Sequence, residues 1–185
     1  MSHTPRREDR DRRSVDQQLS DILIEQISAL FQSLGFRVVT LRHCTPQISL
    51  LDRALTSAVR YRARGIMGAV AILGEWRHVT GFIEDYLGCF DDSMVLDAWM
   101  EISNQITGSF KNRLVEHGLA LSLTPPLPAN AHALHAAGAS WIEVRAHEHC
   151  FYALLDVRTE DGFGLPERRE EISCAMAREG ELYLF

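Results

Sequence analysis

The stretch DAWMEISNQITG, residues 97–108, contains one line of polar side chains within a largely apolar segment. Asp97, Glu101 and Asn104 follow one another at spacings of four and three residues. Each residue advances an α-helix by about 100°, so these spacings place the three side chains on one face. The stretch is therefore predicted to be a helix with one polar face.

The helical pattern extends in both directions, from about residue 92 to Gly118, where glycine is a common stop signal. Asp92 or Ser93 is predicted to be the N-cap because a short polar side chain accepts a hydrogen bond from the first free amides. The solvent face is predicted to comprise Asp97, Glu101, Asn104, Gly108 and Lys111, and the core face Val95, Ala98 or Trp99, Ile102, Ile106, Phe110 and Leu114.

The polar face alone does not separate a functional site from simple solvation, because every amphipathic surface helix has one. Gly108 adds one observation. Glycine in a helix interior costs about 0.5 to 1 kcal/mol relative to alanine. A helix that keeps glycine there offers a place where another backbone or side chain can come close.

The other segments predict a second long helix and several strands. Residues 14–34 place apolar side chains at a helical period and end before Gly35, and residues 45–54 are expected to be a connection. Strands are expected at 36–44, 55–62, 66–74, 78–83 and 120–128, with two more in 140–158; short helices are expected at 84–90 and, before a terminal strand, within 164–185. Turns at 64–65 and 74–77 make residues 55–83 an antiparallel meander. We predict an α+β fold, with two long helices packed on a mainly antiparallel sheet.

Composition indicates a single domain at residues 14–185, preceded by a charged, disordered arm at 1–13. The chain has 185 residues, of which 46% are hydrophobic and 24% charged, as in ordinary globular proteins. Five Arg stand against three acids in the arm, so a net charge of −6 leaves the remainder at −8, and nucleic acid is not expected as a partner. The longest apolar runs are about ten residues, about half of what a membrane span needs. Four scattered cysteines without a CxxC pair favour reduced thiols in a cytoplasmic protein.

The motif helix resembles a known signature. Asp97-x3-Glu101-x2-Asn104, then Gly108 and, further on, Pro125 or Pro126, is similar to the pattern of the CheC, CheX and FliY phosphatase family of bacterial chemotaxis. EISNQITGSF, residues 101–110, is closest to the CheX branch. The resemblance includes the order of elements over most of residues 14–158, and it implies the CheC/CheX-like fold.

The resemblance implies dephosphorylation of a phosphorylated CheY-like response regulator. Asn104 would then orient the attacking water, and Glu101 would grip the receiver through its active-site Lys. Asp97, Gly108 and Lys111 are expected on the contact face. An acyl phosphate is reactive, so its hydrolysis needs positioning more than a strong base, and a carboxamide can hold the water. The phosphatase needs no cofactor of its own, because Mg2+ would come with the receiver.

One alternative function stays open. A domain of this kind can also dock a receiver or another signalling protein without hydrolysis. The CheC branch has a second Glu-x2-Asn on its first helix, whereas here Glu25 is followed by Ser28, which lacks the amide, so only one site is expected.

A homodimer formed through sheet edges is expected from the CheX resemblance. Residues 44–56 and 159–185 lie outside the match.

The histidines, cysteines and tryptophans do not indicate a second functional site. His147-x-His149 would share one face of a strand, and His132-x2-His135 could share a helical turn, but no carboxylate or Cys pattern completes a metal site, so none is expected. Surface or turn positions are the simpler interpretation of these histidines. Cys150 and its neighbour His149 point to opposite faces of a strand, which argues against a Cys-His nucleophile. Trp76, Trp99 and Trp141 are expected to pack in the core or at hairpins.

Overall fold

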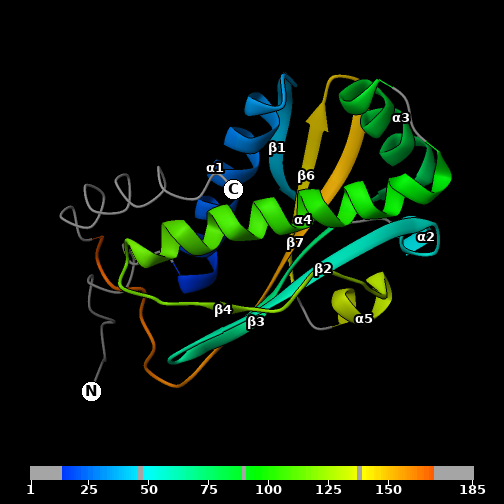
Figure 1. The fold of residues 1–185 in the computed structure, drawn as a ribbon. Helices are drawn as coiled ribbons and strands as arrows, with labels where there is room; N and C mark the ends of the chain where they lie inside the picture. Colours follow the sequence, from blue (N-terminus) through cyan, green and yellow to red (C-terminus); the bar gives the residue numbers. More distant parts are fainter. Residues whose placement is uncertain (1–13, 46–47, 89–90, 137–138, 169–185) are drawn as a thin grey trace, which may run out of the picture.

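The computed structural model describes residues 14–45, 48–88, 91–136 and 139–168. Figure 1 shows the arrangement of the helices and strands. The helices are α1 (Val15–Ser33), α2 (Ile48–Leu51), α3 (Trp76–Leu87), α4 (Asp92–Val115) and α5 (Ala131–Ala136). The strands are β1 (Val38–Cys44), β2 (Ala54–Ala63), β3 (Ile66–Glu75), β4 (Ser122–Leu123), β5 (Leu127–Pro128), β6 (Ser140–Ala146) and β7 (His149–Thr159).

All seven strands of the described residues belong to one sheet, in which every pairing is antiparallel. The order is β1-β6-β7-β3-β2-β4, and β5 also pairs with β2. Two hairpins, β2–β3 and β6–β7, lie side by side through the pairing of β3 with β7. β1 joins from the other end of the chain, with Arg42 opposite Glu143. The predicted α+β class with an antiparallel sheet is confirmed.

The helices α1, α3 and α4 pack on one face of this sheet. In Figure 1, α4 crosses in front of the strands, with α1 toward one end and α3 toward the other. Aromatic rings fill the space behind α4: the Trp99 ring centroid lies 5.1 Å from that of Phe151 and 6.5 Å from that of Phe82. A second, smaller core contains Leu51 of α2 and Ala131 of α5. It forms on the opposite face, because Ala71 and Leu73 of β3 alternate with Val70 and Ile72, which belong to the larger core.

Most predicted elements are found close to their expected bounds, but the strand predicted at 78–83 is wrong. These residues belong to α3, and β3 continues to Glu75 where a hairpin turn was expected. The second neighbour of β3 is therefore β7, and there is no three-stranded meander. The β-branched Val79 and Thr80 suggested a strand, yet Val79, Phe82 and Ile83 are buried at the three- and four-residue spacings of a helix.

Smaller differences concern caps and connections. The connection at 45–54 contains the short helix α2, and α5 follows the proline-rich segment. The N-cap of α4 is one residue earlier than predicted: the Asp91 side chain accepts a hydrogen bond from the Met94 amide at 3.1 Å. Crossing a bilayer would need a longer or more apolar helix than any found in the described ranges. The arm at 1–13, Cys89, and residues 169–185 with Cys174 lie outside the described residues.

Candidate functional site

The inner face of α4 is buried as the sequence predicts. Val95, Trp99, Ile102, Ile106, Phe110 and Leu114 are each at most 3% exposed. These residues repeat every three or four positions, and they pack on β2 and β3 and against α1 and α3. Contacts on this face fix the rotation of the helix. The opposite stripe must therefore point away from the domain.

The outer stripe includes a polar pair that faces solvent. Asp97, Glu101 and Asn104 are exposed, and Gly108 and Lys111 are partly exposed. The Asn104 amide nitrogen donates to Glu101 Oε2 at 3.5 Å, and the Gln105 amide nitrogen donates to Glu101 Oε1 at 3.0 Å. In this arrangement the amide nitrogen of Asn104 turns toward the carboxylate, which leaves the carbonyl oxygen as the free group of the side chain.

Gly108 lies in open space on the same stripe. A Cβ built at this position would meet no atom of the described chain within 4 Å. Tight packing inside this protein therefore does not explain the glycine. Asp97 and Lys111 likewise make no hydrogen bond or ion pair with any described residue.

The corresponding positions on α1 are engaged within the fold. Glu25 pairs with Arg113 of α4 at 3.5 Å, and Arg113 also contacts Glu116 at 2.6 Å. Ser28 accepts a hydrogen bond from the Gln32 amide at 3.2 Å. Glu25, the carboxylate of the spacing that resembles a second site, therefore joins α1 to α4.

The cysteines of the described ranges do not form a nucleophilic site. Cys44 and Cys150 are half-buried and free, and burial raises the pKa of both thiols, which disfavours the reactive thiolate. Between them lies Glu143, whose carboxylate accepts hydrogen bonds from Arg145 at 2.5 Å and Arg42 at 2.8 Å. These hydrogen bonds hold the pKa of Glu143 below its usual range, so this cluster is a set of satisfied ion pairs.

The four histidines singled out in the sequence occupy different settings. His132 is exposed and bonds Asp52 at 2.7 Å, whereas His135 packs against the ring of Trp141, so the two do not converge. His147 is exposed in the hairpin turn with φ 53°. His149 is not a surface residue: it is 6% exposed and its Nε2 lies 2.8 Å from Asp85 Oδ2 of α3. Of the tryptophans, Trp99 and Trp141 are buried as expected, but Trp76 is 44% exposed.

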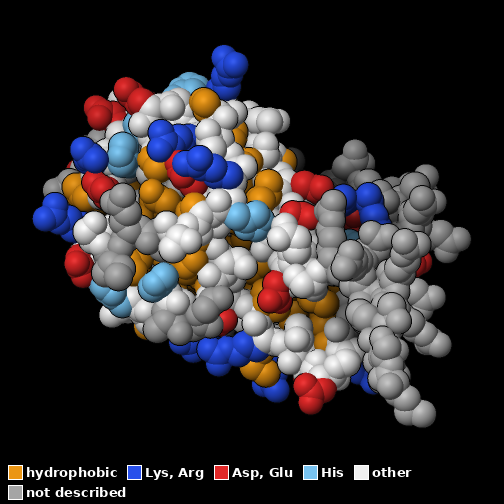
Figure 2. Space-filling model, turned by 180° about the vertical axis from the view of Figure 1, so that it is seen from behind, with side chains coloured by type: hydrophobic (Ala, Val, Ile, Leu, Met, Phe, Trp, Pro, Cys, Tyr) orange, Lys and Arg blue, Asp and Glu red, His pale blue; other side chains and the backbone are white. Residues whose placement is uncertain are grey.

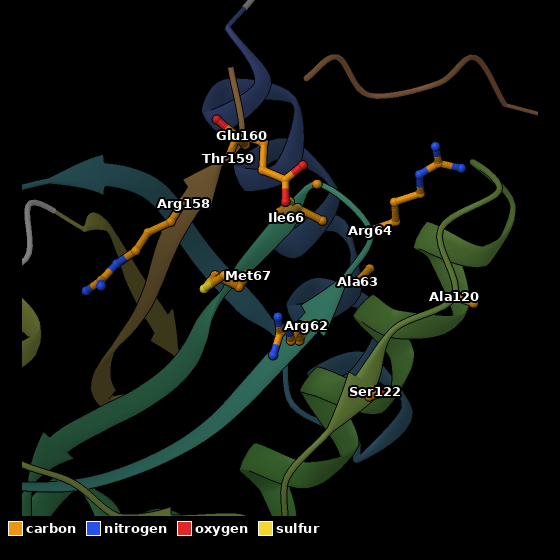
Figure 3. A pocket seen from close by; sticks show the side chains of 11 residues that line it. Arg62, Ala63, Arg64, Ile66, Met67, Ala120, Ser122, Arg158, Thr159 and Glu160 are labelled. Carbon is orange, nitrogen blue, oxygen red and sulfur yellow. The ribbon is translucent and has the colours of Figure 1, made fainter. Parts of the chain in front are cut away.

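Three cavities among the described residues have no lining residue from the polar stripe. One of about 480 Å³ lies at the turn of the β2–β3 hairpin and has no lining residue from α4. Three of its lining residues are arginines, but Figure 3 shows the side chains of Arg62, Arg64 and Arg158 pointing in different directions. Figure 2 shows the molecule from behind, where basic, acidic and histidine side chains are interspersed. Because the three guanidinium groups in Figure 3 do not converge on one point, we assign no anion site to this cavity.

Comparison with solved structures shows which fold the chain has. No protein-family model matches the sequence, and no curated protein matches it either. CheX from Vibrio vulnificus aligns with a TM-score of 0.61 at 12% identity, over 76% of this chain and 99% of that chain. The chain has the CheX fold. A chain of the CheX–CheY–BeF3–Mg2+ complex from Borrelia burgdorferi aligns with a TM-score of 0.62 at 13% identity, over 78% of this chain and 99% of its own.

A CheC-like superfamily protein from Shewanella sp. PV-4 aligns comparably, with a TM-score of 0.60 at 14% identity, over 79% of this chain and 99% of that chain. The recognition made from the motif helix is thus confirmed at the level of the fold. The same low identities leave the roles of Glu101 and Asn104 to be argued from their own geometry. The sequence pattern identified Glu101 and Asn104. It did not identify the contact between Asp85 and His149, which the packing of α3 on β7 brings together.

Proposed function

We propose that this protein dephosphorylates a phosphorylated CheY-like receiver, using Glu101 and Asn104 of α4. The observation that carries the proposal is the exposed pair itself: a carboxylate and a carboxamide hold each other on the outer face of a helix whose inner face is fixed by the core. The pair contributes no contact to the core of the domain. A role outside the domain explains both side chains.

The CheX fold supports a receiver as the partner. One of the structures that share the fold is a complex of CheX with CheY, BeF3 and Mg2+. For the present chain, a receiver would dock over the stripe from Asp97 to Lys111. At about 1.5 Å per residue this stripe is about 21 Å long, which suits contact with a small domain. Asp97 and Lys111 would lie at its two ends and Gly108 would give clearance to the docked surface.

The chemistry requires little from the phosphatase. The carbonyl oxygen of Asn104 would accept a hydrogen bond from a water and hold that water in line with the phosphorus and the leaving carboxylate oxygen. Glu101 would contact a Lys of the receiver through a charge-assisted hydrogen bond, which fixes the position of Asn104. The receiver would supply Mg2+ and the remaining donors, so no metal of this chain enters the step.

The decisive experiment follows the decay of the receiver phosphoryl group over time with added protein. Asn104→Ala is expected to remove about 100-fold or more of the added rate, because the water loses its positioning group, while receiver binding persists. Asn112→Ala is the matched control, since Asn112 is an exposed carboxamide elsewhere on α4. A full rate with Asn104→Ala would show the mechanism to be wrong.

A docking module without hydrolysis is the second candidate. Its support is the same exposed stripe, which can bind a partner whether or not water is oriented. The two functions separate in one assay. A docking module binds the receiver and leaves the phosphoryl lifetime unchanged, whereas a phosphatase shortens it.

A homodimer through the β1 edge accompanies this proposal. β1 has one sheet neighbour, β6, among the described strands, and Val39 on it is 64% exposed. The other edge carries Pro125, Pro126 and Pro128, which cannot donate to a further strand. Light scattering at micromolar concentration is expected to show a dimer, and Val39→Lys a monomer, because edge charges oppose pairing. A monomeric wild-type chain would contradict the dimer.

A further inference from the structure

Three metal-binding side chains meet where α3 packs on the β6–β7 hairpin. Asp85 comes from the last turn of α3, Glu148 from the hairpin turn, and His149 from the first position of β7. One ligand atom of each lies within 4.8 Å of the other two. We infer that Asp85, Glu148 and His149 bind a divalent transition metal of the Zn2+ type.

The imidazole is held in place before any metal arrives. The His149 side chain is 7% exposed, its ring stacks on Phe151 at 6.2 Å between centroids, and it meets Phe82 edge-on at 6.1 Å. Gly81 gives the ring its space, because a Cβ there would lie 2.9 Å from His149 Cε1. This packing directs Nε2 to Asp85 Oδ2, at 2.8 Å. A ligand fixed in this way loses little freedom on binding.

The donor set selects the class of metal. One imidazole nitrogen and two carboxylate oxygens suit Zn2+, which binds such atoms at about 2.0 to 2.2 Å, whereas Mg2+ and Ca2+ prefer oxygen ligands throughout. The Asp85 side chain is half-exposed and Glu148 is exposed, so small rotations of both can close the site around an ion. Water would take the fourth position. The two carboxylates would balance the charge of the ion.

The sequence pattern does not reveal Asp85 as a ligand. His147-x-His149 has no carboxylate at a metal-binding spacing beside it in the sequence. In the structure, His147 belongs to the turn, and Asp85 comes from a helix that ends far earlier in the chain. A metal at this point would join α3 to the β6–β7 hairpin. The rings of Phe82 and Phe151 lie between the site and α4, since each contacts both His149 and Trp99.

The chain contains its own control for this inference. His132 Nε2 lies 2.7 Å from Asp52 Oδ1, so this pair has nearly the same geometry as His149 with Asp85. Among the described residues no third ligand joins His132 and Asp52. If His149 and Asp85 form an ordinary hydrogen-bonded pair, the two sites should respond to metal in the same way.

The test is titration of the full chain with Zn2+ by calorimetry, after EDTA treatment and removal of the EDTA. We expect one Zn2+ per chain, an unfolding temperature raised by Zn2+ and not by Mg2+, and no change with His132→Asn. Glu148→Gln should weaken Zn2+ binding about 10-fold or more and leave the unfolding temperature of the metal-free protein unchanged, because Glu148 is exposed. His149→Asn should abolish binding, but it can also disturb packing, so Glu148→Gln is the decisive variant.

Three outcomes would overturn the inference. The first is no Zn2+ binding by the wild type, and the second is equal affinity in Glu148→Gln, which would leave only a histidine–aspartate pair. The third is a Co2+-loaded protein whose absorption shows thiolate-to-metal charge transfer, because that would assign the ion to cysteines. Receiver dephosphorylation is not used as a readout, so the metal site and the proposed function can fail separately.

Discussion

The two long helices show how the same spacing can serve two purposes. α1 carries Glu25 and Ser28, and α4 carries Glu101 and Asn104, so each helix has a carboxylate followed three residues later by a polar side chain. Glu25 is paired with Arg113 of the neighbouring helix, whereas the partners of Glu101 among the described residues are the side-chain amides of Asn104 and Gln105 on its own helix. The difference lies in the available partners. A polar stripe is free for function where the fold places no opposite charge beside it.

The largest expected contrast comes from removing each carboxylate in turn. Glu101→Ala should lower kcat/KM for receiver dephosphorylation about 10- to 100-fold, which corresponds to one charge-assisted hydrogen bond. Glu25→Ala should keep kcat/KM within about twofold of wild type and reduce the free energy of unfolding by at most about 1 kcal/mol. Steady-state kinetics and urea unfolding measure the two effects. Equal activity losses would mean that both helices contact the receiver.

Gly108 offers a smaller contrast in which stability and docking change in opposite directions. Gly108→Ala should raise the free energy of unfolding by about 0.5 to 1 kcal/mol, because alanine favours the helix and the new Cβ would meet no described atom within 4 Å outside its own stretch of helix. The same Cβ should weaken receiver binding by about 1 kcal/mol or more if the docked surface fills that space. Ser28→Ala on α1 is the control. Unchanged binding by Gly108→Ala would remove Gly108 from the contact face.

The smallest expected effect is that of placing an asparagine on α1, and it tests most directly whether α1 and α4 differ because of Arg113. Ser28→Asn restores to α1 the amide found on α4, yet Glu25 beside it stays paired with Arg113. We expect the dephosphorylation rate to change by less than about twofold. Measuring Ser28→Asn in the background of Asn104→Ala makes any new activity visible. A clear gain would show that spacing alone creates a site.

The sequence is informative where the signal is local and periodic. The stripes of α4 follow from the order of its residues, and the hairpin of β6 with β7 follows from alternation around His147 to His149. The failure at α3 has a physical cause: β-branched residues favour strands locally, but burial of Phe82 against Phe31 and Phe151 outweighs that preference.

The remaining features depend on contacts between distant segments. Asp85 and His149 are 64 residues apart, and the pairing of Glu25 with Arg113 joins two helices that many residues separate. Neither position has a local pattern that marks its partner. The exposed face of α4 was therefore predictable, whereas the pairing of Glu25 on α1 with Arg113 was not.

The order of the strands also has a consequence for synthesis. β1 pairs with β6, so Arg42 finds Glu143 only after 101 further residues have been added. A chain that leaves the ribosome from its N-terminus can complete the β2–β3 hairpin early, but β1 must wait for β6, and α1 must wait first for α4 and then for β6. Contacts of such long range slow folding, because the loop must close before they form. For much of its synthesis the apolar side of α1 therefore lacks its cover by α4 and β6, and β1 lacks the strand that it pairs with.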